Sequence, residues 1–389
     1  MARTRRLEGQ VVVITGASSG IGRCAAAAFA REGAAVVLAA RRGQALHQAA
    51  EDVLHAGGRA MVVETDVRDE AQVQRLAERA VDAFGGIEVW INNAGVGHFS
   101  RFEETPPDVF AEVVNTTFFG TVHGTRAVLP HFRERGQGVI INNVSIAGRV
   151  PAPFHTAYAS AKHAVLGFAD TLRLELRDTP GIQVCNVLPG PIDTPFWQHA
   201  ANFSGREVKA LQPAHPPEEV AETMVRLALH PQREVGVNAP VRIAELARAV
   251  APGMVDRMWG RMTESQLFRN RPHERTRGAV VRPMPEGREV HGGWGGPQGS
   301  SIPWTGLLAL AVPIGAAVYY GTRSGGHQPQ RQDAGMRGAG MQADMHAGMR
   351  VEAQGSRQSV RGRADLHDDR PEMAGRYTRR RTDQFYEVY

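Results

Sequence analysis

From residue 9 to about residue 249, short apolar runs alternate with longer stretches in which apolar positions recur every three or four residues. The short runs are rich in Val, Ile and Ala and contain few polar residues, which indicates strands buried on both faces. These predicted strands are 11–14, 35–39, 61–64, 89–91, 139–144, 183–188 and 235–237. The longer stretches predict helices over 21–31, 45–56, 70–84, 107–133 and 156–177.

Alternation of strands and helices over this length is typical of a parallel sheet whose crossover helices cover both faces. We therefore expect an α/β fold, a Rossmann-type doubly wound parallel sheet, in a single catalytic and dinucleotide-binding domain over residues 1–262. Ligands of such sheets bind beyond the carboxyl ends of the strands. The residues directly after each predicted strand are therefore the first candidates for chemistry.

The character of the chain changes after residue 262. Residues 263–301 are rich in Arg, Pro and Gly and show no clear period, which predicts a linker. Residues 302–321 are mostly apolar and uncharged, with Trp304 near one end and Tyr319 and Tyr320 near the other. Their length and flanking aromatics predict a transmembrane helix. A buried helix or a flexible apolar linker is the alternative interpretation.

Arginines are denser before residue 302 than directly after residue 321, which predicts a cytoplasmic catalytic domain anchored to a membrane by one C-terminal helix. The first ten residues are charged and lack the apolar segment of a secretory signal. The two cysteines, Cys24 and Cys185, lie far apart in apolar contexts. Both are expected to be buried thiols in a reducing compartment, without a disulfide.

Residues 322–389 contain few large apolar side chains, which predicts a disordered tail. The methionines Met336, Met341, Met345 and Met349 recur loosely there, and low-complexity sequence is a better account of them than a soft-metal site. We predict no metal site. The net charge of +5 is modest and spread along the chain, so we expect no binding of nucleic acid.

A glycine-rich segment, Thr15 to Gly22, joins the first predicted strand to the first predicted helix. Gly16, Gly20 and Gly22 allow the backbone to approach a phosphate and the helix to pack closely on the strand. The free amides and positive dipole end of the helix then favour a pyrophosphate. A tight turn alone would not require three glycines at this spacing.

Arg41 and Arg42 come directly after the second predicted strand, and Ala40 stands where an acidic residue would bind an unmodified adenosine ribose. Two cations at this position favour a 2′-phosphate. The sequence therefore predicts NADP(H) as the cofactor in preference to NAD(H). An arginine pair on a solvated loop is the alternative, because the whole chain is rich in arginine.

Lys162 is one of only two lysines in a chain with 43 arginines. It follows Tyr158 by four residues, so a helix would place the two side chains on one face. An ammonium beside a phenol stabilises the phenolate and is expected to lower the pKa of Tyr158 toward working pH. A phenol adjusted in this way is suited to general acid and base catalysis.

Several motifs occur together and in order, and the first 250 residues resemble the short-chain dehydrogenase/reductase superfamily. The segment Thr15 to Gly22 is similar to its cofactor loop, Asn92 to Gly95 to its NNAG segment, and Pro189 to Thr194 to the loop that closes over nicotinamide. The resemblance implies cofactor contacts from Gly16, Ser18, Ser19, Gly20, Ile21, Gly22, Arg41, Arg42, Asp66, Val67, Asn93, Ala94, Gly95, Tyr158, Lys162, Pro189, Gly190, Ile192 and Thr194.

The same resemblance implies a catalytic set of Tyr158, Lys162, Ser145 and Asn115. Tyr158 would exchange a proton with the substrate oxygen, Ser145 would hold that oxygen, and Lys162 would bind the nicotinamide ribose. Asn115 would support a water chain that reprotonates Tyr158. Val144 departs from a serine common in the family. The resemblance also implies a homo-oligomer.

We expect a small-molecule alcohol or carbonyl substrate, with its selection in residues 195–217. Phe196, Trp197, Phe203 and Leu211 make this segment apolar, which predicts a lipophilic substrate. An alternative function is a cofactor-bound sensor or scaffold whose turnover is incidental. An acyl-thioester ketone reductase is a further alternative, for which this segment offers no specific feature.

Overall fold

The computed structural model describes residues 6–238, 241–295 and 387–388. The predicted transmembrane helix over 302–321 and all but two residues of the predicted tail lie outside these ranges, so both stay predictions. Among the helices that are described, none is both long enough and apolar enough to cross a bilayer.

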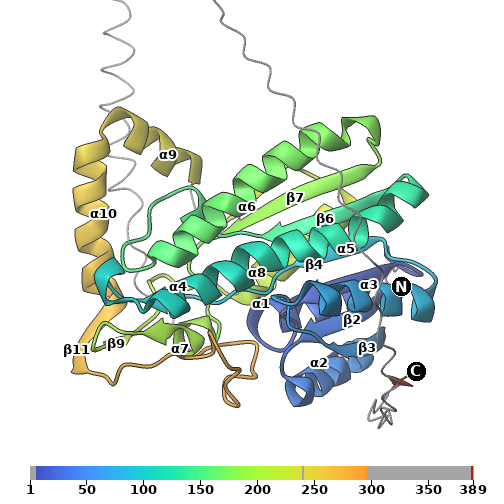
Figure 1. Ribbon diagram of the computed structural model, residues 1–389, viewed down its shortest axis with the longest axis horizontal. Helices are drawn as coiled ribbons and strands as arrows, with labels where there is room; N and C mark the ends of the chain where they lie inside the picture. The colour runs from blue at the N-terminus through green and yellow to red at the C-terminus, as the bar shows by residue number, and fades with distance from the viewer. Residues whose placement is uncertain (1–5, 239–240, 296–386, 389) are drawn as a thin grey trace, which may run out of the picture. The chain divides into compact units, whose positions relative to one another are not determined.

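A twisted sheet forms the centre of the domain (Figure 1). Its strand order is β10-β7-β6-β4-β1-β2-β3-β12, and the first seven strands run parallel while the short β12 pairs antiparallel with β3. The strands are β1 (Val11–Thr15), β2 (Ala35–Ala40), β3 (Arg59–Glu64), β4 (Val89–Asn92), β6 (Gly138–Asn143), β7 (Ile182–Pro189), β10 (Glu234–Val237) and β12 (Glu387–Val388). The predicted Rossmann-type parallel sheet is confirmed.

Helices cover both faces of this sheet. One face packs against α1 (Gly20–Arg31), α2 (Gly43–His55) and α8 (Pro217–Leu229). The other packs against α3 (Glu70–Phe84), α5 (Gly120–Arg135) and α6 (Thr156–Glu175). The sequence did not indicate α8, whose first turn contains Pro217, Glu218 and Glu219.

Strand β1 shows why the apolar runs are continuous. Val12 and Ile14 belong to the apolar cluster on the α1 side, whereas Val11 and Val13 belong to the cluster on the α3 side. All four are at most 2% exposed. Successive side chains of a strand point to opposite faces, so burial on both faces requires apolar residues at every position.

The helix predicted over 107–133 is interrupted. It consists of α4 (Pro107–Val114), a π-helical turn (Asn115–Phe119) and α5. A π-helical turn adds a residue to the helix and rotates the residues after it, and such turns are frequent at functional sites. Apolar periodicity does not reveal this insertion, because the flanking helical turns keep their pattern.

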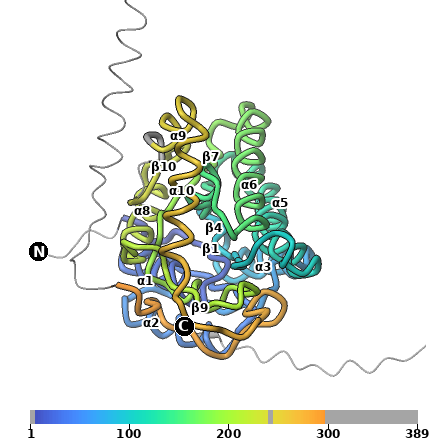
Figure 2. Tube along the Cα trace, turned by 90° about the vertical axis from the view of Figure 1, so that its left-hand side faces the viewer, coloured from blue at the N-terminus to red at the C-terminus, as the bar shows by residue number. Residues whose placement is uncertain are grey.

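The chain beyond β10 folds back on the domain. Helices α9 (Val241–Val250) and α10 (Pro252–Leu267) lead to β11 (Phe268–Pro272), which pairs antiparallel with β9 (Arg206–Val208). The orange segment after β11 runs along the end of the domain where α2, α7 (Phe196–His199) and β9 lie (Figures 1 and 2). The interval predicted as a linker thus begins inside α10 and, as far as residue 295, packs against the domain.

The two remaining strands of the described residues, β5 (His98–Phe99) and β8 (Ala201–Asn202), are short. Strand β5 pairs in parallel with β8. This pairing holds the chain after β4 against the segment predicted to select the substrate.

Candidate functional site

A cleft of about 300 Å³ lies at the carboxyl ends of the central strands, beside the point where the strand order reverses between β1 and β4. A reversal of this kind is where doubly wound sheets bind ligands. Every residue that the sequence assigned to cofactor binding or catalysis lines this cleft, except Asn115. The structure therefore brings these residues together, while their roles in binding stay predictions.

The side chains of Thr15 and Asn93 hold the turn between β1 and α1 against the end of β4. The Nδ2 atom of Asn93 donates to the carbonyl oxygens of Thr15, at 2.9 Å, and Gly16, at 3.1 Å. A Cβ atom on Gly22 would lie 2.3 Å from the Gly16 oxygen and 2.5 Å from Asn93 Nδ2. Glycine is therefore required at position 22 for this turn to keep its shape.

The helix start beside this turn has no side-chain cap, although its Gly20 amide donates to the Glu289 carbonyl oxygen at 3.0 Å. Ser19 precedes α1 without capping it through its side chain, and the first turn of α1 contains no acidic residue. Instead, the hydroxyl oxygens of Ser18 and Ser19 both accept hydrogen bonds from Arg42 Nη2. Free amides at a helix start, together with a cation, suit a phosphate group.

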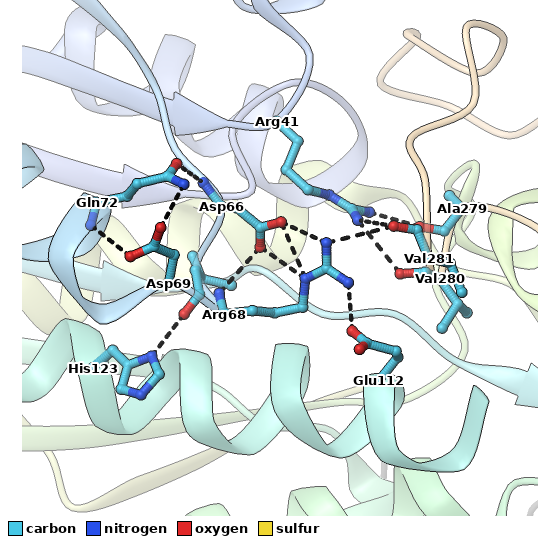
Figure 3. A network of polar contacts seen from close by, with 11 residues as sticks. Arg41, Asp66, Arg68, Asp69, Gln72, Glu112, His123, Ala279, Val280 and Val281 are labelled. Atoms are coloured by element: carbon cyan, nitrogen blue, oxygen red, sulfur yellow. Dashed lines mark hydrogen bonds and ion pairs between the residues drawn. The ribbon is translucent and has the colours of Figure 1, made fainter. Parts of the chain in front are cut away.

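A charged network borders the end of the cleft that Arg41 and Asp66 line, where the sequence predicts the adenosine (Figure 3). The carboxylate of Asp66 accepts hydrogen bonds from the Arg68 guanidinium at 2.9 Å and 2.5 Å, and Arg68 also pairs with Glu112. Arg41 donates instead to main-chain carbonyl oxygens of residues 279–281. Asp66 is thus already paired, and Val67 beside it offers an apolar wall.

The other end of the cleft gathers Tyr158, Ser145 and Lys162. Tyr158 and Lys162 come from α6, and the Lys162 Nζ atom lies 5.5 Å from the centroid of the Tyr158 ring. Ser145 lies just after β6 and forms a hydrogen bond with Tyr158. Ser145 has a φ of 141°, a conformation that non-glycine residues rarely adopt and that is concentrated at functional sites.

Burial dominates the titration of this group. It raises the pKa of Tyr158 to about 12, and the hydrogen bond to Ser145 acts in the opposite direction. Burial also lowers the pKa of Lys162 to about 7. The expected lowering of the Tyr158 pKa by Lys162 is therefore not what the structure shows, because both side chains lie where either charge is poorly solvated.

The structure does not bring Asn115 to this group. Asn115 lines a second hollow together with Asp66, Arg68, Asp69, Gln72 and Glu112. The π-helical turn rotates the chain so that Thr116, one residue later, lines the main cleft. Thr117 is fully buried, and its Oγ1 atom donates to the Val96 carbonyl oxygen at 3.2 Å and accepts from Val96 N at 3.4 Å.

The substrate end contains residues that the sequence argument missed. His155, Trp259, Thr263 and Leu267 line the cleft beside the predicted Phe196, Trp197 and Leu211. Phe203 does not line it but packs in an apolar cluster with Val109 and Val280. The position of His155, three residues before Tyr158 at the start of α6, could have indicated it, whereas α10 comes from a region without recognisable motifs.

Two polar atoms at this end have no hydrogen-bond partner among the described residues. They are His155 Nδ1 and Thr263 Oγ1, both inaccessible to water. The ring of His155 instead packs 4.2 Å from that of Phe99 and 5.1 Å from that of Tyr158. Burial, followed by the charge of His98, keeps the pKa of His155 well below its usual value, so the ring is neutral.

The cleft fits a nicotinamide dinucleotide at both ends. Lys162 is 4% exposed, and the one hydrogen bond described for its ammonium is to the Asn143 carbonyl oxygen, at 2.6 Å. Because an ammonium has three donors, two remain for ribose hydroxyls. The glycine turn and the start of α1, which has no side-chain cap, fit the pyrophosphate.

Comparisons with known proteins identify the family. The sequence profile of the short chain dehydrogenases matches residues 10–204. The oxidoreductase YxnA of Bacillus subtilis (strain 168) is 35% identical over 278 residues, which cover 69% of this chain and 77% of YxnA. The chain belongs to the short-chain dehydrogenase/reductase superfamily, and it is an oxidoreductase acting on CH–OH and C=O groups.

Solved structures agree with this assignment. An alcohol dehydrogenase from the archaeon Thermococcus sibiricus, complexed with 5-hydroxy-NADP, shares 28% identity with a TM-score of 0.52, over 59% of this chain and 95% of that one. A short chain dehydrogenase/reductase from Burkholderia phymatum, in complex with NAD, shares 26% identity with a TM-score of 0.57, over 64% and 96%.

Proposed function

We propose that the protein is an NADP(H)-dependent oxidoreductase that interconverts a lipophilic alcohol and its ketone or aldehyde. The observation that carries this proposal is the meeting of Tyr158, Ser145 and Lys162 at one end of the cleft whose other end is the glycine turn. A sensor or scaffold would have no need for a strained serine hydrogen-bonded to a phenol.

Tyr158 would exchange the proton. With a pKa raised to about 12 by burial, it is protonated at neutral pH and can donate to the oxygen of a substrate carbonyl. Ser145 would donate a second hydrogen bond to that oxygen and fix its position. When bound, the cofactor supplies the hydride for the carbonyl carbon, and oxidation takes the reverse course.

Lys162 would hold the cofactor ribose through its two remaining donors. Its bond to the Asn143 carbonyl oxygen fixes the ammonium at the wall of the cleft. Lys162 would thus orient the nicotinamide ring of the bound cofactor relative to Tyr158.

The preference for NADP(H) rests on Arg41 and Arg42. Both line the adenosine end of the cleft, and no carboxylate pairs with either of them within the described part of the chain. A 2′-phosphate would give these cations a partner with charge-assisted hydrogen bonds. The two solved relatives hold an NADP derivative and NAD respectively, so the family accommodates both.

A lipophilic substrate fits the opposite end. Phe196, Trp197 and Leu211 line it from one side, and Trp259 and Leu267 from α10 line it from another. Trp259 is fixed by a hydrogen bond from its Nε1 atom to the Pro151 carbonyl oxygen, at 2.9 Å. Walls of this kind favour an apolar substrate body with few polar groups.

A substrate panel tests the function. NADPH oxidation would be monitored with lipophilic ketones and aldehydes and with small hydrophilic carbonyl compounds, in parallel with NADH. The proposal expects turnover of the lipophilic members, faster with NADPH. Turnover confined to small sugars contradicts the substrate class, and no turnover of any member in either direction favours the sensor.

We also propose a membrane anchor over residues 302–321 and a homo-oligomeric state, neither of which the described residues address. Fractionation of the full chain and of a variant lacking 302–321 tests the anchor. Equal recovery of both in the detergent-free soluble fraction contradicts it. Light scattering in detergent measures the oligomeric state, and a monomer contradicts the second proposal.

A further inference from the structure

Residues 279–289, here called the strap, form a wall of the cofactor cleft beside Arg41. The Arg41 Nη2 atom donates to the Ala279 carbonyl oxygen at 2.6 Å. Its Nη1 atom donates to the carbonyl oxygens of Val281, at 3.3 Å, and Val280, at 3.4 Å. Figure 3 shows the guanidinium directed at these three carbonyls and away from Asp66.

Arg42 makes a similar set of bonds farther along the strap. Its Nη1 atom donates to the carbonyl oxygens of Glu286, at 2.8 Å, and Met284, at 3.2 Å. Both Nη atoms approach the Gly287 oxygen at 3.2 Å, and Nη2 also reaches the two serine hydroxyls of the glycine turn. All the Nη donors of Arg42 therefore already face an acceptor.

The strap is also attached to the start of α1. The Gly20 amide, at the helix start, donates to the Glu289 carbonyl oxygen at 3.0 Å, and Arg23 donates to the Arg288 oxygen at 2.8 Å. At its other end, Val280 is fully buried in a cluster with Val109 and Val113. Arg41 therefore binds the end of the strap that Val280 anchors, and Arg42 binds its middle, where His199 Nε2 also contacts the Glu286 oxygen at 3.0 Å.

These bonds satisfy the Nη donors of both arginines, and no carboxylate of the described residues forms an ion pair with either guanidinium. Burial lowers the pKa of both Arg41 and Arg42, which shows that their charged forms are poorly solvated. The bonds to the main-chain carbonyls are charge-assisted through the guanidinium alone, whereas a phosphate would add its own negative charge and form an ion pair with the guanidinium. A phosphate group would therefore displace the carbonyls, whereas a hydroxyl group would not.

We propose that the strap determines which cofactor is bound, by competing with the adenosine 2′-phosphate for Arg41 and Arg42. NADP(H) exchanges the strap carbonyls for its phosphate and loosens residues 279–289, whereas NAD(H) binds with the strap in place. The free-energy preference for NADP(H) over NAD(H) then equals the free energy gained from the bonds to the 2′-phosphate minus the free energy needed to release the strap. This inference rests on the proposed function, because it requires a dinucleotide in the cleft.

Position 287 gives a variant that weakens the strap without touching either arginine. Gly287 has a φ of +65°, and a Cβ atom there would lie 2.2 Å from His199 Nε2. Gly287→Val therefore destabilises the attached strap. Gly253→Val, on α10, is the matched control, because a Cβ atom at Gly253 meets nothing within 4 Å.

The test combines hydrogen exchange of the full chain with calorimetric titration of NADP⁺ and NAD⁺. We expect saturating NADP⁺ to increase amide exchange in residues 279–289 and NAD⁺ to leave it unchanged. Gly287→Val should tighten NADP⁺ binding by roughly tenfold, equivalent to about 1.4 kcal/mol, and change NAD⁺ binding by less than about twofold. Gly253→Val should match the wild type.

Three results would overturn the inference. The first is slower exchange of the strap with NADP⁺, which would make it a clamp closing on the cofactor. The second is an equal effect of Gly287→Val on both cofactors, which leaves the proposed function intact. The third is binding of neither cofactor by the wild type, which also removes the proposed function.

Discussion

The ammonium of Lys162 lies 5.5 Å from the ring centroid of Tyr158, on the same face of α6. Burial moves the two pKa values toward the neutral forms, raising that of Tyr158 to about 12 and lowering that of Lys162 to about 7. The pair therefore keeps a protonated phenol beside an amine that titrates near neutral pH. At neutral pH Tyr158 therefore carries the proton that carbonyl reduction requires, although burial makes the phenol a weaker acid.

The lowered pKa of Lys162 predicts a pH-dependent stability. Between pH 7 and about 10.5 the unfolded chain keeps a proton on this lysine that the folded chain has released. The unfolded state then binds more protons, so stability rises with pH, by up to about 1.4 kcal/mol per pH unit from this group. Lys162→Met should remove this rise, as measured by urea unfolding from pH 6 to pH 10.

Below pH 7 both states carry the proton, and the difference in unfolding free energy between wild type and Lys162→Met should stop changing with pH. Lys209→Met, at the chain's other lysine, serves as the control and should keep the wild-type slope. Parallel pH profiles for wild type and Lys162→Met would contradict the lowered pKa.

Substitution by leucine should affect the unfolding free energy differently at His98 and at His155, the two buried histidines near Tyr158. In His98 both ring nitrogens have partners, Ala157 N at 3.1 Å and Ser100 Oγ at 3.2 Å, whereas His155 Nδ1 has none. Removing a partnered group leaves polar atoms unsatisfied, so His98→Leu should cost about 2 kcal/mol or more of unfolding free energy. His155→Leu should be neutral or stabilising, by up to about 1 kcal/mol.

Urea unfolding of the two leucine variants measures this difference. A loss in His155→Leu as large as that in His98→Leu would contradict the unpaired state of His155. The kinetics of His155→Leu are informative too, since an increased KM at unchanged kcat would show that substrates use this ring.

The glycine turn predicts a cofactor-specific defect. A Cβ atom at position 22 would collide with the Gly16 oxygen and with Asn93, so Gly22→Ala should deform the turn and weaken dinucleotide binding by roughly a hundredfold, about 3 kcal/mol. Gly167→Ala, in an open position on α6, should gain about 0.5–1 kcal/mol of stability and bind cofactor normally. Calorimetry with NADP⁺ and NAD⁺ checks both, and normal binding by Gly22→Ala would rule out this turn as the phosphate site.

Substitutions of Asn115 and Thr117 should have different effects, which steady-state kinetics and urea unfolding measure. Asn115→Ala should change kcat/KM by less than about threefold, since its side chain borders the second hollow with Arg68 and Glu112. Thr117→Val removes both bonds to the Val96 backbone and should cost about 1–3 kcal/mol of stability. If Asn115→Ala lost activity as completely as a change at Tyr158, the placement of Asn115 would be contradicted.

The strands and most helices could be predicted because burial on both faces of the sheet requires apolar residues at consecutive strand positions, a pattern visible in the local sequence. Val11 to Ile14 must all be apolar, and Gly16, Gly20 and Gly22 must be small, for reasons that act within a few residues. The resemblance supplied the order of motifs, and the sheet then brought Ser145, Tyr158 and Lys162 together from separate elements.

The features that sequence did not reveal depend on long-range contacts. The π-helical turn at Asn115 changes which residue faces the cleft without changing the apolar pattern. Arg41 and Arg42 bind main-chain carbonyl oxygens of the strap, more than 230 residues away in the sequence. Every residue has a main-chain carbonyl, so the sequence does not indicate these contacts. Burial is the main cause of the raised pKa of Tyr158, and the four-residue spacing between Tyr158 and Lys162 does not indicate how deeply the two side chains are buried.

The most direct test of the central claim is the single-turnover rate of NADPH oxidation by Tyr158→Phe and wild type, with the best substrate of the panel and with NADP⁺ affinity measured alongside. The phenol is the proposed proton donor, so the rate should fall by a factor of about 10²–10⁴ while NADP⁺ affinity stays within about twofold. A Tyr158→Phe rate within about threefold of wild type would contradict the assignment of Tyr158 as the proton donor.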